Sequence, residues 1–350
     1  MKLFIIYIVI LILFRIVLMG ISKRNYSKIE MLFCCFAYVG LIALAAFRAP
    51  SVGTDTLSYI SDYKDIYTYT WLDLIERYRG YELFYLICKS FSLLELPIFV
   101  WFAFIEIIYV SAIARLVHSD STDKIYSIIL FITIGLYMFS LAGLKQTMAM
   151  GLVLHAFMEM RSKRYVTTVL LFLLALFVHP TAAIFLPAFL FYACRNTRHY
   201  NLIVICLILL LVLGTKYILS SFSNILRLEH FERYLLVEKT YSIWTLLFYI
   251  LLIIASLPFI KSYSKKSLYQ NEPKFEITCL ILACSLQYLA SLSPSLFRLS
   301  LYYTPFFLVY MPNVLGIRSE IARKVIKLIV ILGVIFFYAY TNRNFVYSLA

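Results

Sequence analysis

The stretch LFIIYIVILILFRIVLM, residues Leu3–Met19, decides the fold class of this chain. Its only charged side chain is Arg15, and it lacks the small-residue cleavage site of a signal peptide, so we interpret it as a membrane span. Similar runs recur along the 350 residues, of which 63% are hydrophobic and only 14% charged. A soluble core of this length cannot bury so much apolar surface, so the sequence predicts an all-α, polytopic integral membrane protein.

Apolar runs that reach, or nearly reach, the length needed to cross about 30 Å of hydrocarbon predict about twelve transmembrane helices. Residues 81–96 are also apolar, but we interpret them as an interfacial or re-entrant helix. We expect residues 1–350 to form a single membrane domain with two longer loops, at 48–96 and 220–242. The expected spans are 3–19, 31–47, 97–117, 125–144, 146–160, 165–179, 181–194, 201–219, 243–260, 275–292, 296–315 and 325–342.

Lysine and arginine residues cluster in alternate connections between these spans. The positive-inside rule places those connections in the cytoplasm, so the two longer loops, which carry most of the acidic residues, face outward. The net charge of +14 therefore indicates topology, and we predict a lipid bilayer and no nucleic acid as partner. The largest clusters are Lys23, Arg24 and Lys28; Arg161, Lys163 and Arg164; Lys261, Lys265, Lys266 and Lys274; and Arg318, Arg323, Lys324 and Lys327.

Metal-binding and nucleotide-binding patterns are missing from the sequence. The seven cysteines are scattered through apolar runs and match neither a disulfide framework nor a metal site. The chain contains no Asp-x-Asp, His-x-x-x-His, Glu-x-x-His or Cys-x-x-Cys spacing, no Gly-rich phosphate loop and no Gly-x-Ser-x-Gly elbow. We therefore predict no metal and no cofactor.

The segment RAPSVGTDTLSY, Arg48–Tyr59, follows the second expected span and is the densest cluster of polar and turn-forming residues in the chain. Thr54 or Asp55 could cap a helix that starts near Leu57, which would give the segment a purely structural role. That role does not explain Arg48 at the border of a span, where an unpaired cation is costly. A phosphate group would supply the partner, because a guanidinium matches its oxygens in a bidentate fork.

Five further polar residues lie on the same predicted face. Lys145 could simply extend to the membrane surface, whereas Gln146 opens a helix whose N–H groups favour an anion. His179 precedes a helix-breaking proline, although a hydrogen-bonded core histidine is the simpler alternative. Arg298 lies in an apolar run, where arginine needs an anionic partner or a wet cavity. Arg233 lies in the second long loop, where a solvated surface explains it equally well.

The distribution of basic residues among the connections assigns Arg48, Asp55, Lys145, His179 and Arg298 to the outer face, independently of these five residues themselves. Three cations, an imidazole and a carboxylate on one face predict a pocket for a phosphorylated amphiphile, with a potential acid/base pair. Two other charged residues, Arg15 and Glu106, lie inside expected spans and could be functional or could form a pair.

Three motifs carry a family resemblance. Arg48…Val52-Gly53-Thr54-Asp55-Thr56…Tyr59 resembles the hallmark of the EpsG family, the Wzy-type polymerases of bacterial surface polysaccharides. Lys145-Gln146…Ala149 resembles the Arg-Gln-x-x-Ala element of that family, and Ala175…Phe177…His179…Thr181-Ala182 resembles its Ala…Phe-His-x-Ser-Ala element. Lys145 replaces the usual arginine, which keeps the charge but not the bidentate geometry.

The resemblance implies metal-independent glycosyl transfer on the outer face of the bacterial inner membrane, in a multi-pass protein for which a GT-C-like architecture is one option. A hydroxyl of one polyprenyl-diphosphate-linked repeat unit attacks the anomeric carbon of the chain on another, and the lipid diphosphate leaves. The product would be O-antigen, capsule or exopolysaccharide, and other polysaccharide assembly proteins are potential partners.

The resemblance and the residue chemistry together assign candidate roles. The reaction needs cations and hydrogen-bond donors that stabilise the charge on the diphosphate. It also needs a general base that takes the proton of the sugar hydroxyl. The diphosphate-binding candidates are Arg48, Lys145, Gln146 and Arg298. The candidates for the base are Asp55 and His179, and those for sugar binding are Tyr59 and Arg233.

Two other classes of protein stay open. A flippase for lipid-linked oligosaccharides has a similar number of spans, but it should carry charges along a central path rather than on one face. A membrane sugar O-acyltransferase would need a histidine within reach of a cytoplasmic acyl donor, whereas the predicted topology puts His179 on the other side.

Overall fold

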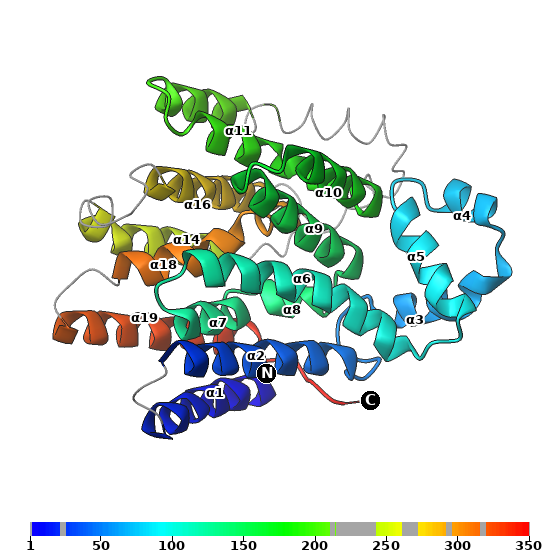
Figure 1. Ribbon diagram of the computed structural model, residues 1–350, viewed down its shortest axis with the longest axis horizontal. Helices are drawn as coiled ribbons and strands as arrows, with labels where there is room; N and C mark the ends of the chain where they lie inside the picture. The colour runs from blue at the N-terminus through cyan, green and yellow to red at the C-terminus, as the bar shows by residue number, and fades with distance from the viewer. Residues whose placement is uncertain are drawn as a thin grey trace.

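The computed structural model describes residues 2–21, 26–210, 214, 243–260, 272–291, 296–315 and 320–349 (Figure 1). Regular secondary structure in these ranges is helical, which confirms the all-α prediction, and the β-pairing within them is an isolated bridge between Arg48 and Leu349. The loop at 220–242, with Arg233, lies outside the described residues, as does the end of the span expected at 201–219.

The α-helices are α1 (Lys2–Ile21), α2 (Tyr26–Ala46), α3 (Thr56–Asp65), α4 (Trp71–Arg77), α5 (Glu82–Leu93), α6 (Ile98–Asp120), α7 (Lys124–Thr133), α8 (Leu136–Ser140), α9 (Leu144–Arg161), α10 (Tyr165–Val178), α11 (Leu186–Cys194), α14 (Ile243–Ser256), α16 (Glu272–Tyr288), α17 (Phe297–Ser300), α18 (Phe307–Leu315) and α19 (Glu320–Thr341). Short 3₁₀ turns connect some of them: η1 (Ile66–Thr68), η2 (Pro180–Phe185), η3 (Leu257–Phe259), η4 (Leu289–Ser291) and η6 (Thr304–Phe306).

Three helices in the described ranges are long and apolar enough to cross a membrane: α1, α2 and α6. The outward surfaces of α1 and α2 carry large aliphatic side chains, such as Leu13, Ile16 and Val39, as a hydrocarbon environment requires. Several shorter apolar helices accompany them, including α7, α10, α18 and α19. The protein is therefore membrane-embedded, and the total of about twelve spans stays a prediction.

The expected span at 125–144 is wrong as a single helix. The chain forms α7, turns at Gly135 with a φ of 93°, and continues as the short helix α8. Glycine adopts this left-handed conformation without a steric penalty, so the helix can end there. The prediction from hydropathy missed the break, because a hydropathy profile does not show where the backbone turns. The expected span at 296–315 is likewise divided, into α17, η6 and α18, and Pro305 lies in the first turn of η6.

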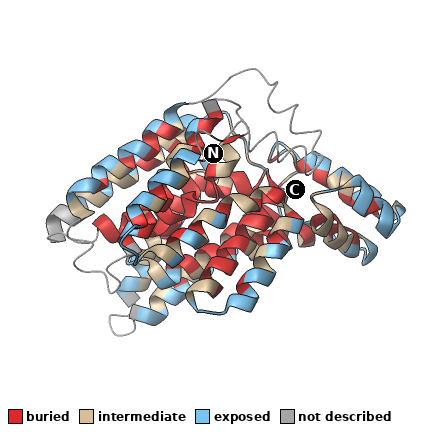
Figure 2. Ribbon diagram, turned by 90° about the horizontal axis from the view of Figure 1, so that it is seen from above, coloured by how far each residue is buried: buried red, intermediate tan, exposed pale blue. Residues whose placement is uncertain are grey.

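The bundle is organised around α6, which packs against α2 on one side and α9 on the other (Figure 1). Gly151 of α9 makes the close approach to α6, because a Cβ atom there would lie 2.8 Å from Cα of Tyr109. Figure 2 shows the buried residues concentrated in the interior of this bundle.

The helices α3, α4 and α5 project beyond the ends of the bundle, at the right of Figure 1. They form the segment expected as the first long loop, and α5 confirms a helix within 81–96. The start of α4 is fixed by a capping box, in which Asp73 N donates to Thr70 Oγ1 at 3.2 Å and Thr70 N donates to Asp73 Oδ2 at 3.0 Å. Helices α3–α5 thus cover one end of the bundle, next to α9 and α10.

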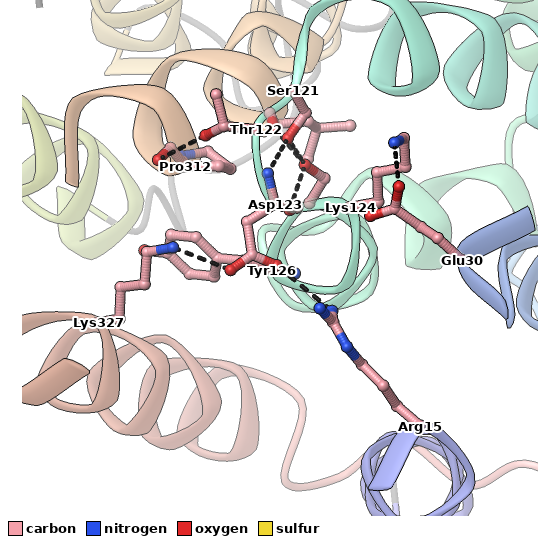
Figure 3. A network of polar contacts seen from close by, with 11 residues as sticks. Arg15, Glu30, Ser121, Thr122, Asp123, Lys124, Tyr126, Pro312 and Lys327 are labelled. Atoms are coloured by element: carbon pink, nitrogen blue, oxygen red, sulfur yellow. Dashed lines mark hydrogen bonds and ion pairs between the residues drawn. The ribbon is translucent and has the colours of Figure 1, made fainter. Parts of the chain in front are cut away.

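A polar hub closes the opposite end, at the turn Ser121–Lys124 between α6 and α7 (Figure 3). Asp123 lies 2.8 Å from Lys327 of α19 and 3.6 Å from Arg15 of α1, and it accepts the Tyr126 N–H at 3.3 Å. Of the two alternatives for Arg15, the structure supports a charge pair, and its partner is Asp123 and not Glu106.

Two further contacts extend the polar hub to α2 and α18. Lys124 pairs with Glu30 of α2 at 2.6 Å, and Thr122 N donates to Asn313 Oδ1 of α18 at 2.8 Å. Basic residues near this end are therefore engaged in ties between helices, in addition to any effect they have on topology.

Candidate active site

The turn that carries Asp55 is shaped by Gly53. This glycine has a φ of 91°, and a Cβ atom there would lie 2.2 Å from the carbonyl oxygen of Leu141. The side chain of Thr56 donates from Oγ1 to the carbonyl oxygens of Val52 at 2.5 Å and Leu141 at 3.3 Å. A side chain at position 53 would disrupt this fit, because the turn packs directly on the connection before α9.

Asp55 stands at the N-cap position of α3, but its side chain makes no capping hydrogen bond. Its Oδ2 atom lies 3.9 Å from Nη2 of Arg298, and the side chains of Arg298 and Asp55 are 32% and 40% exposed. The amide Nε2 of Gln146 donates to the backbone carbonyl of Arg298 at 2.6 Å, which ties α9 to α17. A carboxylate and a guanidinium therefore face each other at a partly open position.

Lys145 lies beside this pair, in the first turn of α9. Its ammonium donates to the Tyr85 hydroxyl at 3.3 Å. It also lies 4.4 Å from the ring centroid of Tyr81, 5.2 Å from that of Tyr85 and 5.7 Å from that of Tyr59. These distances are typical of cation–π contacts, so three tyrosines form a cage around the ammonium.

Tyr59 is the tyrosine of this cage that lies on the same helix as Asp55. It is 7% exposed, so its ring forms part of the floor of the site. Burial and the nearby Asp55 carboxylate raise the pKa of Tyr59 well above its usual range, so its hydroxyl stays protonated and can donate a hydrogen bond.

His179 ends α10 and begins η2. Its Nδ1 atom accepts the backbone N–H of Thr181 at 3.3 Å and lies 2.7 Å from the Thr181 hydroxyl, which in turn lies 3.0 Å from the Tyr302 hydroxyl. The His179 ring packs edge-on against Tyr81 at 5.1 Å, which connects it to the cage. Because a backbone N–H can only donate, Nδ1 is the acceptor, and a neutral ring carries its proton on Nε2.

Arg48 has different surroundings from the other predicted cations. It is 2% exposed, donates to the Ala45 carbonyl and stacks on Phe102 at 4.1 Å. Among the described residues, its Nε and Nη2 atoms have no hydrogen-bond partner, and the main opposite charge near it is the fully buried Glu106 of α6. The structure therefore turns Arg48 into the protein interior, and its contacts do not include the other predicted diphosphate-binding residues.

The remaining predicted residues converge. We use the term rim cluster for Asp55, Tyr59, Lys145, Gln146, His179 and Arg298, which lie at the end of the bundle covered by α3–α5. Their positions follow from the direction of the helices: α2 ends there, α9 begins there and α10 ends there. Their catalytic and binding roles stay predictions.

The sequence pattern did not single out several residues of this site, above all Asp62 and Tyr85. The Tyr85 hydroxyl donates to Asp62 Oδ2 at 3.0 Å, and Asp62 lies two helical turns after Asp55 on α3. The i, i+7 spacing places the two carboxylates on one face of a helix, and this signal could have identified Asp62. The i, i+4 spacing of Tyr81 and Tyr85 is the corresponding signal for the cage.

Groups of three or more His, Cys, Asp or Glu side chains that could hold a metal ion do not occur in the described part of the chain. The rim cluster instead offers two cations, Lys145 and Arg298, a partly exposed carboxylate and several aromatic rings. Such a set can bind an anionic group and sugar rings, and it can accept a proton.

Similarity to known proteins extends over most of the chain. The EpsG family model matches residues 31–348, a range that includes the complete rim cluster. Searches among curated proteins and among solved structures give no match. A GT-C-like architecture therefore stays a prediction.

Proposed function

Because the chain belongs to the EpsG family, we propose that it polymerises polyprenyl-diphosphate-linked oligosaccharide repeat units into a bacterial surface polysaccharide. The observation that carries this proposal is the rim cluster, in which Asp55 and Arg298 face each other at 3.9 Å beside the caged ammonium of Lys145. These groups match the two demands of the reaction, namely a stabilised leaving group and a proton acceptor.

In the proposed reaction, a hydroxyl oxygen of the incoming repeat unit attacks the anomeric carbon of the lipid-linked chain. The new glycosidic C–O bond forms as the bond between the anomeric carbon and the diphosphate oxygen breaks, and the lipid diphosphate leaves with the electron pair. Arg298 and Lys145 stabilise the charge that develops on the diphosphate by preorganised electrostatics. Gln146 holds Arg298 in place through its backbone carbonyl.

We assign the general base to Asp55 in preference to His179. The Asp55 carboxylate is not used for capping and is 40% exposed, so it can receive the proton of the sugar hydroxyl. His179 has its Nδ1 atom engaged by Thr181, so its Nε2 is a donor when the ring is neutral. We propose that His179 donates a hydrogen bond to substrate from Nε2.

Arg48 takes a supporting role in this proposal. Its inward position on Phe102, where it also donates to the Ala45 carbonyl, supports a role in holding the end of α2 against α6. Direct contact with the diphosphate would require the side chain to leave this buried position.

We further propose that the rim cluster faces away from the cytoplasm of the bacterial inner membrane. The opposite end of the bundle carries Arg161, Lys163 and Arg164, and the positive-inside rule favours the cytoplasm for that end. The two polyprenyl tails would lie in the bilayer, and other polysaccharide assembly proteins are the expected partners.

A deletion strain tests the proposed function against transport. Cells that lack this chain should still move single repeat units across the membrane, so those units should accumulate on the outer leaflet or as one-unit products. Repeat units trapped on the cytoplasmic leaflet would overturn the polymerase proposal in favour of a flippase. Full-length polymer that lacks only an acyl group would favour an O-acyltransferase.

A further inference from the structure

Asp62 of α3 is a carboxylate of the site that the proposed reaction does not use. Its Oδ2 atom accepts the Tyr85 hydroxyl at 3.0 Å. Tyr85 is 3% exposed and is stacked on Tyr78 with ring centroids 3.5 Å apart, so its ring has little freedom to move. The same hydroxyl lies 3.3 Å from the ammonium of Lys145.

The direction of these two hydrogen bonds is fixed by chemistry. An ammonium group has donors and no acceptor, so the Tyr85 oxygen must accept from Lys145. The single proton of the Tyr85 hydroxyl must then point elsewhere, and Asp62 receives it. Lys145, Tyr85 and Asp62 therefore form one directed chain of donors and acceptors.

We infer that Asp62 is a positioning residue that acts through Tyr85, fixing the Lys145 ammonium inside its tyrosine cage and aiming it at the diphosphate of the substrate. This inference deepens the proposed function and rests on it, because Lys145 is there assigned to the diphosphate. Asp62 itself does not touch the substrate in this assignment.

Asp62 lies near the Lys145 ammonium but is not in direct contact with it, and this arrangement suits a cation that must bind a substrate. A carboxylate in direct contact would neutralise the ammonium and compete with the diphosphate for it, as Glu30 does with Lys124 at 2.6 Å. Asp62 is held one hydroxyl group away, and the faces of Tyr59 and Tyr81 stabilise a cation without supplying a full negative charge. The ammonium thus stays available to a stronger anion.

The same chain of groups also controls the charge state of Lys145. Burial lowers the pKa of the Lys145 ammonium, Asp62 and Asp55 oppose that shift, and Arg298 adds to it. Replacing Asp62 by an uncharged residue should therefore lower the pKa of Lys145 further, so that the ammonium loses its proton at a lower pH. The charged and titratable groups around it are Asp55, Asp62, Tyr59, Tyr81, Tyr85, His179 and Arg298.

Amine labelling tests the link without any substrate. The full chain would be purified in lipid nanodiscs, and modification of Lys145 by an amine-reactive reagent would be followed against pH by mass spectrometry. Asp62→Asn should shift the labelling curve to lower pH. Asp65→Asn is the matched control, because Asp65 lies on the same helix and is exposed, and its carboxylate accepts the Ser61 hydroxyl at 3.3 Å.

Labelling curves that coincide in the wild type and Asp62→Asn would overturn the inference. Tyr85→Phe separates a positional effect from general misfolding, because it removes the linking hydroxyl and keeps the ring stacked on Tyr78. Asp62→Asn should then shift the curve less in the Tyr85→Phe background than in the wild type, since coupled residues are not additive. Equal shifts in both backgrounds would also count against the link.

Polymerisation provides the second readout, with lipid-linked repeat units extracted from the deletion strain as the probe. Asp62→Asn should slow polymerisation about tenfold, as expected for weakening a charge-assisted contact. The alkaline limb of the pH profile should move to lower pH, whereas Asp65→Asn should follow the wild type. Full activity of Lys145→Ala would reject the proposed role of Lys145, and normal Asp62→Asn activity with an inactive Lys145→Ala would reject the role of Asp62 alone.

Discussion

The rim cluster and the polar hub use the same kinds of side chain at opposite ends of one bundle. In the polar hub, Lys327 lies 2.8 Å from Asp123 and Lys124 lies 2.6 Å from Glu30. At the rim, Asp55 and Arg298 are 3.9 Å apart, and Lys145 meets Asp62 only through Tyr85. The helix α6 separates the two ends by about 34 Å, at 1.5 Å per residue.

The spacing of the charges indicates what each set does. The ion pairs of the polar hub are 14–23% exposed, and they tie α1, α2 and α19 to the turn before α7. The Lys124–Glu30 and Lys327–Asp123 pairs neutralise each other at contact distance, and Arg15 adds a longer pair to Asp123 at 3.6 Å, so together they stabilise helix packing. Asp55 and Arg298 at the rim are more exposed and less closely matched, as a site requires if an anionic substrate is to complete it.

Substitution of Arg48 should have the largest effect on stability. It tests whether this buried cation has a structural role, unlike the partly exposed cations of the rim cluster. Arg48→Ala removes a buried side chain that lies on Phe102 and leaves a cavity there, which should cost about 2–5 kcal/mol, as for other large-to-small substitutions in a core. The expected outcome is a lower protein level and a lower melting temperature in detergent. Arg48→Met combined with Glu106→Leu should restore much of the stability, because an apolar pair of similar volume replaces the charges. If Arg48→Ala instead had normal stability but formed no polymer, the result would support direct binding of the diphosphate by Arg48.

Arg298 gives the largest expected effect on the reaction. Arg298→Ala should reduce polymerisation by roughly 10²–10³, by analogy with the loss of one oxyanion-hole donor, at a nearly normal protein level. Arg298→Lys should recover only part of this, since an ammonium cannot form the bidentate fork. The measurement is the rate of polymer formation in membranes with matched amounts of protein. Wild-type polymer length in Arg298→Ala cells would remove this residue from the mechanism.

Asp123 of the polar hub should behave in the opposite way. Asp123→Asn can keep the cap on α7 but loses the ion pairs with Lys327 and Arg15, so it should destabilise the protein by about 0.5–1 kcal/mol. Thermal unfolding in detergent should report this loss, while polymer length and amount stay normal. Loss of polymer from a normally folded Asp123→Asn protein would contradict the assignment of separate roles to the two ends.

Lys145→Arg has the smallest expected effect. The substitution restores the residue that the EpsG motif usually has at this position and keeps the charge, and an arginine can stack on the same tyrosine rings. Polymer amount should stay within about twofold of the wild type, since no charge is lost. Gel analysis of polymer from matched cultures provides the measurement, with Lys145→Ala as the inactive reference. Equal loss in both variants would indicate that the cage requires a lysine specifically.

Hydropathy and charge predicted the parts of the fold that depend on the free energy of transferring side chains from water into the membrane. Membrane insertion, the all-α class and the helix directions that bring Asp55, Lys145, His179 and Arg298 together follow from apolar length and alternating basic connections. The break at Gly135 was missed, because a glycine turn inside an apolar run changes direction without changing hydropathy.

The missed features of the site share a different cause. The inward orientation of Arg48 depends on Phe102 and Glu106, which are distant in sequence, and a charge at a span border predicts only that a partner is needed. The link from Asp62 to Lys145 depends on Tyr85 and therefore on how α5 packs over α3 and α9. Tertiary packing decides both, so a local pattern suggests candidates but not their contacts.

Polymerisation by the rim cluster depends above all on Asp55, the proposed general base. Purified protein in lipid nanodiscs would be mixed with lipid-linked repeat units from the deletion strain, and products of more than one unit would be counted together with released polyprenyl diphosphate. We predict that the wild type forms longer products and releases polyprenyl diphosphate in equal amounts. Asp55→Asn should lose activity by about 10²–10⁴, the usual contribution of a general base. Asp123→Asn should stay active. Wild-type activity in Asp55→Asn would contradict this assignment.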